Sequence, residues 1–227
     1  MTEQSPAMRV LEAALPHVPF DGWSDATLKA ALTDSGIDPA LGAALFPRGP
    51  LDLALAYHRK GDACMVARLA DMDLGSLRFR DRIAAAVMAR LDLVEDKELV
   101  RRGTTFFALP HNAAEGGKAI WGTADAIWTA LGDTSDDLNW YSKRATLSAV
   151  YSATVLFWLG DDSPGQQNTR EFLDRRIENV MQFEKLKAGL QANPLTRALL
   201  AGPMKLLSGI RAPHRPDDLP GTMKDPL

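Results

Sequence analysis

The 227-residue sequence contains a single cysteine, Cys64, which excludes an intramolecular disulfide and a metal site built from several cysteines. Valine and isoleucine are also scarce, with 9 and 6 copies against 33 alanines and 31 leucines. Because alanine and leucine favour helices whereas β-branched residues favour strands, this composition predicts an all-helical fold. The longest apolar runs are far shorter than the roughly 20 residues that span a bilayer, so no transmembrane helix is expected.

Charge and known short motifs exclude further classes of protein. The net charge of −3 gives no overall attraction to nucleic acid. The sequence has neither a phosphate-binding glycine loop nor a dinucleotide fingerprint, and without a catalytic constellation we do not expect an enzyme. The first 15 residues fit neither a secretory signal nor an arginine-rich transit peptide, so we expect a cytoplasmic location.

Helical periodicity and capping residues divide nearly the whole chain into helices. Ser24 and Asp38-Pro39 are typical helix starts, and residues 135–137 supply another N-terminal cap. The expected helices cover residues 6–15, 25–32, 39–46, 49–60, 62–72, 76–101, 104–131, 138–158 and 167–188. The stretch 104–131 is expected to open irregularly at Leu109-Pro110.

Three short helices at the start of the chain suggest a helix-turn-helix. Residues 8–58 resemble the N-terminal region of TetR-type regulators, through Arg9–Leu15, Gly22-Trp23-Ser24, Ser35-Gly36-Ile37 and Ala44–Arg48. However, residues 1–47 contain two bases against six acids, whereas DNA binding requires lysine and arginine to neutralise phosphates. The third helix carries no side chain that pairs with a base edge. We therefore expect no nucleic-acid partner, and a ligand-responsive transcriptional regulator is the alternative.

Gly116 and Gly117 lie inside an expected helix, where each glycine costs roughly 1 kcal/mol relative to alanine. Small residues surround the pair, so one interpretation is a close contact between two helices. The other interpretation is a gap that admits an apolar ligand, because lipid pockets are mostly apolar with a few polar groups. The residues that would form or border this gap are Gly116, Gly117, Ile120, Trp121, Ala124, Trp128, Leu147, Tyr151 and Val155.

Trp140 and Tyr141 occupy the first turn of the helix that ends at residue 158. Because adjacent helical side chains point about 100° apart, both cannot face one narrow core stripe. At least one is expected at the surface beside Lys143 and Arg144, and exposed aromatics with arginine are typical of protein interfaces. The alternative is a core tryptophan with a surface tyrosine. If the two helices pack as antiparallel partners, the neighbours of this surface are Asp125, Ile127 and Trp128.

Residues 189–211 are amphipathic and basic. Residues 184–211 contain five bases and one acid, within a chain whose net charge is −3. A basic amphipathic helix beside an acidic body is typical of a membrane-surface or partner-binding segment. The alternative is a helix packed on the body or on a dimer mate. The residues expected to contact a membrane are Leu195, Arg197, Leu199, Lys205, Leu206, Leu207 and Ile210.

The segment from 104 to 183 carries the most specific motifs. They are Leu109-Pro110-His111-Asn112, Trp121, Asp125, Trp128 and, most discriminating, Asp137-Leu138-Asn139-Trp140-Tyr141-Ser142-Lys143-Arg144. Through these motifs, residues 8–188 resemble the ninth Coq protein family, the lipid-binding accessory proteins of ubiquinone biosynthesis.

The resemblance implies an all-α, TetR-like helical bundle whose degenerate helix-turn-helix no longer binds DNA. It implies no catalytic residue, no metal and no cofactor other than a bound isoprenoid lipid or quinone intermediate. The implied partners are the di-iron hydroxylase that acts on demethoxyubiquinone, a membrane surface, and a second copy in a homodimer. The hydroxylase would dock at Asp125, Ile127, Trp140, Tyr141, Lys143 and Arg144.

Four regions follow from these expectations. Residues 1–58 form the degenerate helix-turn-helix-like region, and residues 59–188 form the helical core for lipid binding and dimerisation. Residues 189–211 form the amphipathic membrane-binding helix, and residues 212–227 form a disordered tail. The protein is then expected to be cytoplasmic and peripherally associated with a membrane.

Overall fold

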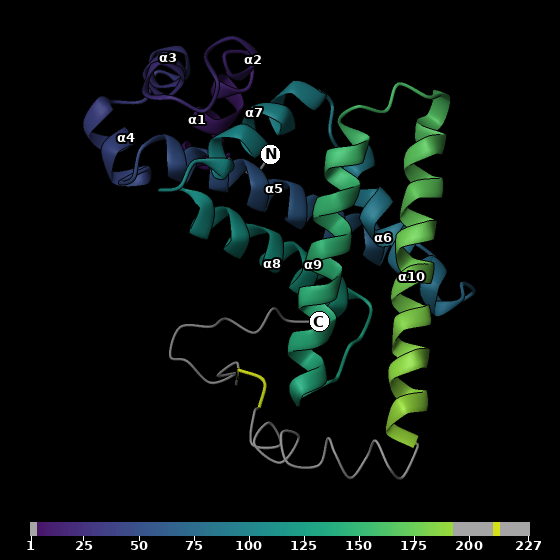
Figure 1. The fold of residues 1–227 in the computed structure, drawn as a ribbon. Helices are drawn as coiled ribbons and strands as arrows, with labels where there is room; N and C mark the ends of the chain where they lie inside the picture. The colour runs from purple at the N-terminus through teal and green to yellow at the C-terminus, as the bar shows by residue number, and fades with distance from the viewer. Residues whose placement is uncertain (1–3, 193–210, 214–227) are drawn as a thin grey trace.

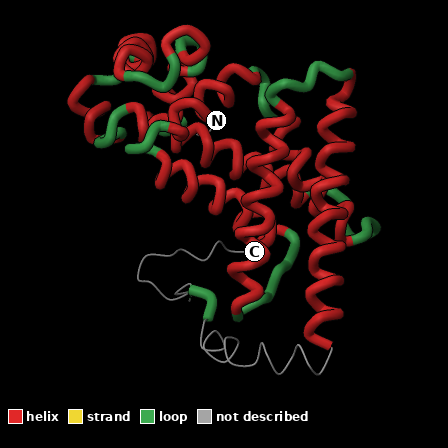
Figure 2. Tube along the Cα trace, in the orientation of Figure 1, coloured by secondary structure: helices red, strands yellow, loops and turns green. Residues whose placement is uncertain are grey.

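A computed structural model describes residues 4–192 and 211–213, and all regular structure in this part of the chain is helical (Figure 1, Figure 2). This confirms the predicted fold class. No helix among the described residues is long and apolar enough to cross a membrane. The helices are α1 (Pro6–Ala14), α2 (Val18–Asp21), α3 (Asp25–Ser35), α4 (Pro39–Leu45), α5 (Pro50–Ala70), α6 (Phe79–Asp92), α7 (Lys97–Ala108), α8 (Ala113–Ala130), α9 (Leu138–Trp158), a 3₁₀ turn (Pro164–Gln166) and α10 (Gln167–Ala192).

The predicted caps begin the helices where the sequence places them. The Ser24 hydroxyl accepts the backbone N–H of Thr27 at 3.2 Å. The Asp38 carboxylate accepts the N–H of Ala40 at 2.8 Å. Asp137 accepts the N–H of Asn139 in the same way, at 2.9 Å. Each cap satisfies a backbone donor that the first helical turn leaves unpaired.

Three predicted helix boundaries are wrong. α5 replaces two expected helices, because Gly61 stays helical, and the buried guanidinium of Arg90 packs against it. The helix expected at 76–101 is divided into α6 and α7, since the Asp96 side chain caps a new helix by accepting the N–H of Glu98 at 2.8 Å. The helix expected at 104–131 is broken at Leu109-Pro110, where α7 ends, and α8 starts at Ala113.

The buried apolar residues form two clusters that share α5. The first half of α5 contributes Leu53 to a cluster with α1, α3 and Leu99 of α7. The second half contributes Met65 to a larger cluster with α6, α8, α9 and α10. Trp23 of the first cluster is hydrogen-bonded to α7, because its indole N–H donates to the Leu99 carbonyl at 3.2 Å.

Two of the region boundaries expected from the sequence fall inside helices and do not separate structural units. The boundary between residues 58 and 59 falls within α5, so the two clusters have a common rigid element. α10 continues past residue 188 to Ala192, so it includes the start of the expected membrane-binding segment. Of the expected C-terminal tail, the structure describes Ala212 and Pro213.

Gly116 allows α7 and α8 to approach closely. A Cβ atom at position 116 would lie 2.7 Å from the Cβ of Phe107, whereas a Cβ atom at Gly117 would meet no atom within 4 Å. The close-contact interpretation therefore holds for Gly116, and Gly117 adjoins open space.

The adjacent glycines should respond oppositely to alanine. Gly116→Ala is expected to lower the free energy of unfolding by about 1–2 kcal/mol, because overpacking against Phe107 exceeds the gain in helix propensity. Gly117→Ala should raise it by about 0.5–1 kcal/mol through propensity alone. Urea denaturation of both variants measures these changes, and equal shifts in the same direction would contradict the described contact.

Candidate functional site

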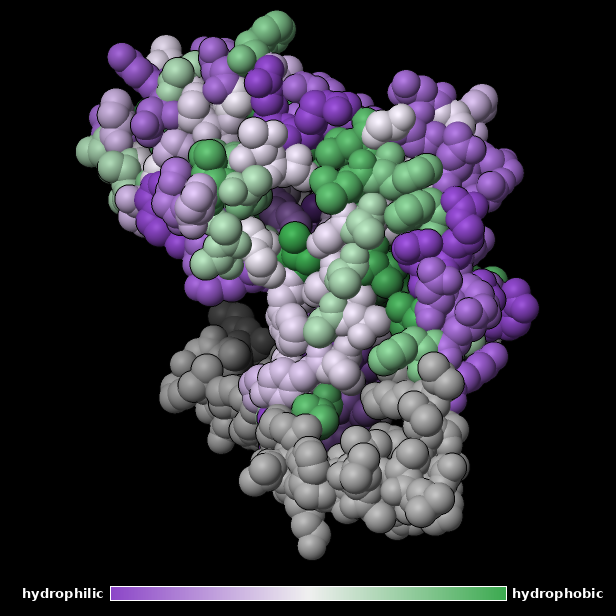
Figure 3. Space-filling view, viewed as in Figure 1, coloured by the Kyte–Doolittle hydropathy of each residue, from purple (hydrophilic) through white to green (hydrophobic). Residues whose placement is uncertain are grey.

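A cavity of about 420 Å³ lies where the two apolar clusters meet, walled by α5, α6, α7, α8 and α9. The space-filling view shows a hollow beside α9 with hydrophobic residues around it (Figure 3). Gly117 and Leu156 line the cavity and are exposed, whereas Leu91 and Tyr151 line it and are buried. The cavity therefore has an open mouth and a buried end.

Five of the nine residues predicted to form or border a gap line this cavity. They are Gly116, Gly117, Ile120, Tyr151 and Val155. The other four do not line this cavity. Ala124 is fully buried in the larger apolar cluster, and Trp121 contacts other aromatic rings. Trp128 and Leu147 line a separate cavity of about 250 Å³ between α6, α9 and α10.

Residues of α8 that line the cavity and residues that do not lie on different faces of this helix. Gly116 packs against Phe107 of α7. Trp121 and Trp128, seven residues apart, lie on a face that contacts the first half of α9, where the Trp128 indole donates to the Lys143 carbonyl at 3.1 Å. This seven-residue spacing was a signal in the sequence that could have separated the two tryptophans from Gly116.

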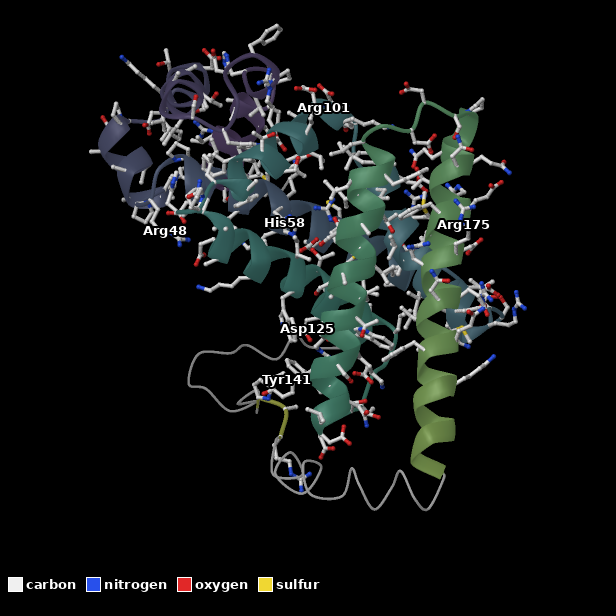
Figure 4. All side chains as sticks on the ribbon, in the orientation of Figure 1. Arg48, His58, Arg101, Asp125, Tyr141 and Arg175 are labelled. Atoms are coloured by element: carbon white, nitrogen blue, oxygen red, sulfur yellow. The ribbon has the colours of Figure 1, made fainter. Side chains whose placement is uncertain are left out.

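Three polar side chains at the buried end were missed by the sequence analysis: Tyr57 and His58 of α5, and Arg90 of α6. Arg90 Nε donates to Asp62 at 2.8 Å, and Arg90 Nη2 donates to the His58 carbonyl at 3.3 Å. Figure 4 shows His58 between α5 and α8. The sequence held one signal of this polar group, because Arg90 is a charged residue within the otherwise apolar run 83–91.

Thr123 of α8 completes this polar network. Its hydroxyl donates to the Asp62 carboxylate at 3.0 Å, and His58 Nε2 lies 2.8 Å from Thr123 Oγ1 and 3.1 Å from the Ala119 carbonyl. Because a carbonyl oxygen only accepts, His58 Nε2 carries a proton. Burial lowers the pKa of His58 against the opposing effect of Asp62, so the imidazole is neutral at pH 7.

The two tyrosines at the cavity are neutral donors. Burial raises the pKa of Tyr57 to about 12, and burial also raises the pKa of Tyr151. Both hydroxyls therefore keep their protons at physiological pH. Apolar walls with a few polar groups at one end are typical of a pocket for a small apolar ligand.

A second feature is the aromatic surface, which we define as Trp121, Trp140 and Tyr141. The Trp121 ring lies 5.9 Å from that of Trp140 and 6.4 Å from that of Tyr141, and the latter two rings are 4.8 Å apart. All three are half-buried, so each presents part of its ring at the surface. Figure 4 places Tyr141 at the start of α9, with Asp125 nearby on α8.

The short described segment 211–213 lies beside Tyr141 of the aromatic surface (Figure 4). The Tyr141 hydroxyl donates to the Arg211 carbonyl at 3.1 Å, and the Ala212 N–H donates to the Asp136 carbonyl at 2.8 Å. The Arg211 guanidinium also lies 3.4 Å from the Asp136 carboxylate. A segment distant in sequence is therefore hydrogen-bonded to the surface predicted to receive a partner.

Arg144, predicted at the partner surface, is instead buried with 2% of its side chain exposed. Its Nε donates to Asp125 at 2.6 Å and its Nη1 to Asp133 at 2.9 Å. Its guanidinium also lies 4.1 Å from the ring centre of Trp140. Because a buried charge is stable only when paired, Arg144 ties α8 to α9 and is not available to a partner.

Two other residues of the predicted partner surface also have structural contacts. Ile127 is fully buried in the larger apolar cluster, which excludes a surface role. Lys143 is partly exposed, but its ammonium donates to Asp133 and Ser135 at 2.6 Å each. The residues that remain accessible are Asp125, Trp140, Tyr141 and part of Lys143.

The predicted membrane-contacting residues all lie outside the described part of the chain. They are Leu195, Arg197, Leu199, Lys205, Leu206, Leu207 and Ile210.

The paired Asp133 makes stability depend on pH. Burial raises the pKa of this carboxyl, but hydrogen bonds from Lys143, Arg144 and Ser135 outweigh burial and lower the pKa to about 2. Asp133→Asn is expected to lower the free energy of unfolding by about 2 kcal/mol at pH 7.

Because the folded-state pKa lies below the unfolded value, this difference from wild type should be complete above roughly pH 4 and lost as the pH falls towards 2. Urea denaturation at pH 7 and pH 3 measures it. Asp174→Asn, which removes an exposed carboxylate with no ion pair among the described residues, is the control and should change little. A difference between Asp133→Asn and wild type that does not shrink in acid would contradict this account.

Comparison with known proteins adds sequence relatives. Residues 113–184, which cover α8, α9 and most of α10, match the COQ9 family model. The chain is 27% identical over 193 residues to "Probable ubiquinone biosynthesis protein coq9, mitochondrial" of Dictyostelium discoideum, covering 81% of this chain and 62% of that protein. It is 30% identical over 183 residues to the Drosophila melanogaster "Ubiquinone biosynthesis protein COQ9, mitochondrial", covering 78% and 56%. The human protein of the same name is 29% identical over 190 residues, covering 80% and 59%.

The chain thus spans about three fifths of the length of these curated relatives. Among solved structures, a TetR transcriptional regulator from Nitrosomonas europaea ATCC 19718 matches with a TM-score of 0.62 at 19% identity. The match covers 76% of this chain and 95% of the regulator, and at this identity it shows the fold alone. These comparisons confirm the resemblance predicted from the sequence: the chain is a relative of the COQ9 proteins and has a TetR-type fold.

Proposed function

We propose that this protein is a non-catalytic accessory protein of ubiquinone biosynthesis. It binds an isoprenoid quinone intermediate and presents it to a di-iron hydroxylase at a membrane surface, acting as a homodimer. The observation that carries the proposal is the apolar cavity with an open mouth at Gly117. The names of the relatives, which are ubiquinone biosynthesis proteins, support the pathway.

The cavity suits an apolar chain. Its volume of about 420 Å³ is within the range of about 300–1,000 Å³ typical of ligand pockets. Transfer of an isoprenoid tail from water into these walls would contribute roughly 25 cal/mol for each Å² of apolar surface removed from water. A carrier needs this desolvation, because the tail is otherwise insoluble in water.

The aromatic surface supports a docking role for the start of α9. Partly exposed tryptophan and tyrosine rings are enriched among the residues that dominate binding energy at interfaces. Trp121, Trp140 and Tyr141 form one contiguous group, while the Arg144 network beneath holds α8 and α9 in a fixed relation. The hydroxylase would therefore meet a rigid patch that loses little conformational freedom on binding.

The alternative, a ligand-responsive transcriptional regulator, has less support from the residues. The fold is shared with TetR regulators, but α4, the counterpart of a recognition helix, reads Pro-Ala-Leu-Gly-Ala-Ala-Leu and offers no base-pairing side chain. The two bases and six acids of residues 1–47 give this part of the chain no attraction to phosphate.

The cavity proposal is tested by extraction and mass spectrometry of the protein purified from its own host. Wild type should yield isoprenoid quinone intermediates above a mock purification. Gly117→Trp should reduce the yield severalfold without unfolding the protein, because the ring enters the open space beside α8.

Gly122→Trp is the matched control for this variant. Gly122 lies in the same helix and also adjoins open space, but it does not line the cavity. This variant should retain the wild-type yield. Loss of lipid in both variants, or in neither, would contradict the assignment of the cavity.

The docking proposal predicts that Tyr141→Ala keeps the fold and weakens hydroxylase binding about tenfold, in line with the loss of one aromatic hot spot. Phe20→Ala, which removes an aromatic ring 82% exposed on α2, is the control and should bind normally. Titration of the purified hydroxylase measures both affinities. Unaltered binding by Tyr141→Ala would exclude the aromatic surface as the docking site.

A further inference from the structure

The buried end of the cavity offers hydrogen-bond donors that the protein leaves unused. Tyr57 and Tyr151 both line the cavity, and neither hydroxyl is hydrogen-bonded to any residue in the described part of the chain. Tyr151 is 5% exposed as a whole residue, but its hydroxyl is not among the buried polar atoms that lack a partner, so it faces the cavity. Both hydroxyls are therefore available to an oxygen acceptor of a ligand that enters the cavity.

Arg90 adds a third donor at the same end. Its Nε and Nη2 are occupied by Asp62 and the His58 carbonyl, whereas its Nη1 forms no hydrogen bond with any described residue. The guanidinium is held in place by these two bonds and by its packing against Gly61. A fixed donor beside two tyrosine hydroxyls forms a preorganised group for oxygen acceptors.

The charges at this end are already balanced. The Arg90 cation is paired with the Asp62 carboxylate, and His58 is neutral because burial lowers its pKa. An anionic head group, such as a phosphate or a diphosphate, would therefore add an uncompensated charge to a buried site beside Asp62. A neutral group with carbonyl or ether oxygens would meet three donors without this cost.

We propose that the ligand enters this cavity head first, with a neutral oxygen-bearing ring hydrogen-bonded by Tyr57, Tyr151 and Arg90 and its apolar tail directed to the mouth at Gly117 and Leu156. This inference rests on the proposed function of the cavity as a lipid site. It adds the orientation of the ligand in the cavity and the residues that hold its uncharged ring. In this orientation the ring is shielded from water inside the protein, and it must leave the cavity before another protein can modify it.

The test compares two probes that share a tail but differ at the head. One is a dimethoxy-methyl-benzoquinone with three isoprene units, and the other is farnesene, a hydrocarbon of three isoprene units without oxygen. The dissociation constant of the quinone is measured by quenching of tryptophan fluorescence, since Trp23 lines the cavity, and that of farnesene by competition. Wild type is expected to bind the quinone about tenfold or more tightly than farnesene.

Tyr151→Phe removes one hydroxyl and keeps the ring that packs in the core. It is expected to weaken quinone binding about three- to tenfold and to leave farnesene binding unchanged. Tyr57→Phe should act in the same direction. Thr154→Val, which removes a hydroxyl from the same helix outside the cavity, is the matched control and should bind both probes as wild type does.

The outcomes separate this inference from the proposed function. If wild type binds both probes equally and neither tyrosine variant discriminates between them, head-first binding is overturned while lipid binding stands. If wild type binds neither probe, both proposals fail. Farnesyl diphosphate binding that is tighter than quinone binding would overturn the neutral head group.

Discussion

The contact of Arg90 with α5 is the constraint on which the rest of the structure depends. A buried guanidinium must be paired, and its partners Asp62 and the His58 carbonyl fix α6 against the middle of α5. Thr123 connects the same carboxylate to α8 at 3.0 Å. Three helices therefore meet at one polar junction between two apolar clusters. This junction is also the buried end of the cavity, so the group that orders the helices also determines its chemistry.

α8 connects the two functional features. Gly116, Gly117 and Ile120 line the cavity, while Trp121 and Asp125 belong to the side that contacts α9 and the aromatic surface. Arg144 joins Asp125 to Asp133, so α8 cannot move without disturbing the start of α9.

The helices could be predicted largely from local chemistry, but the continuation of α5 through Gly61 could not. Ser24, Asp38 and Asp137 begin helices because each side chain satisfies a neighbouring backbone donor, which needs no tertiary contact. Gly61 lies between two helices expected from the sequence, but α5 continues through it, and Arg90, 29 residues away in the sequence, occupies the space that a side chain would fill. The division of residues 76–101 depends on the cap at Asp96.

The sequence by itself determined that the chain is helical, that its first 47 residues are poor in bases, and that it resembles the COQ9 proteins. The small residues around Gly117 left open either a close helix contact or a gap beside α8. Only the tertiary structure decided which residues surround that gap. Tyr57 and Arg90 reach the cavity from α5 and α6, and no local periodicity brings them together with Tyr151 of α9. The tertiary structure also buried Arg144, where its charge is paired with Asp125 of α8 and with Asp133 of the loop between α8 and α9.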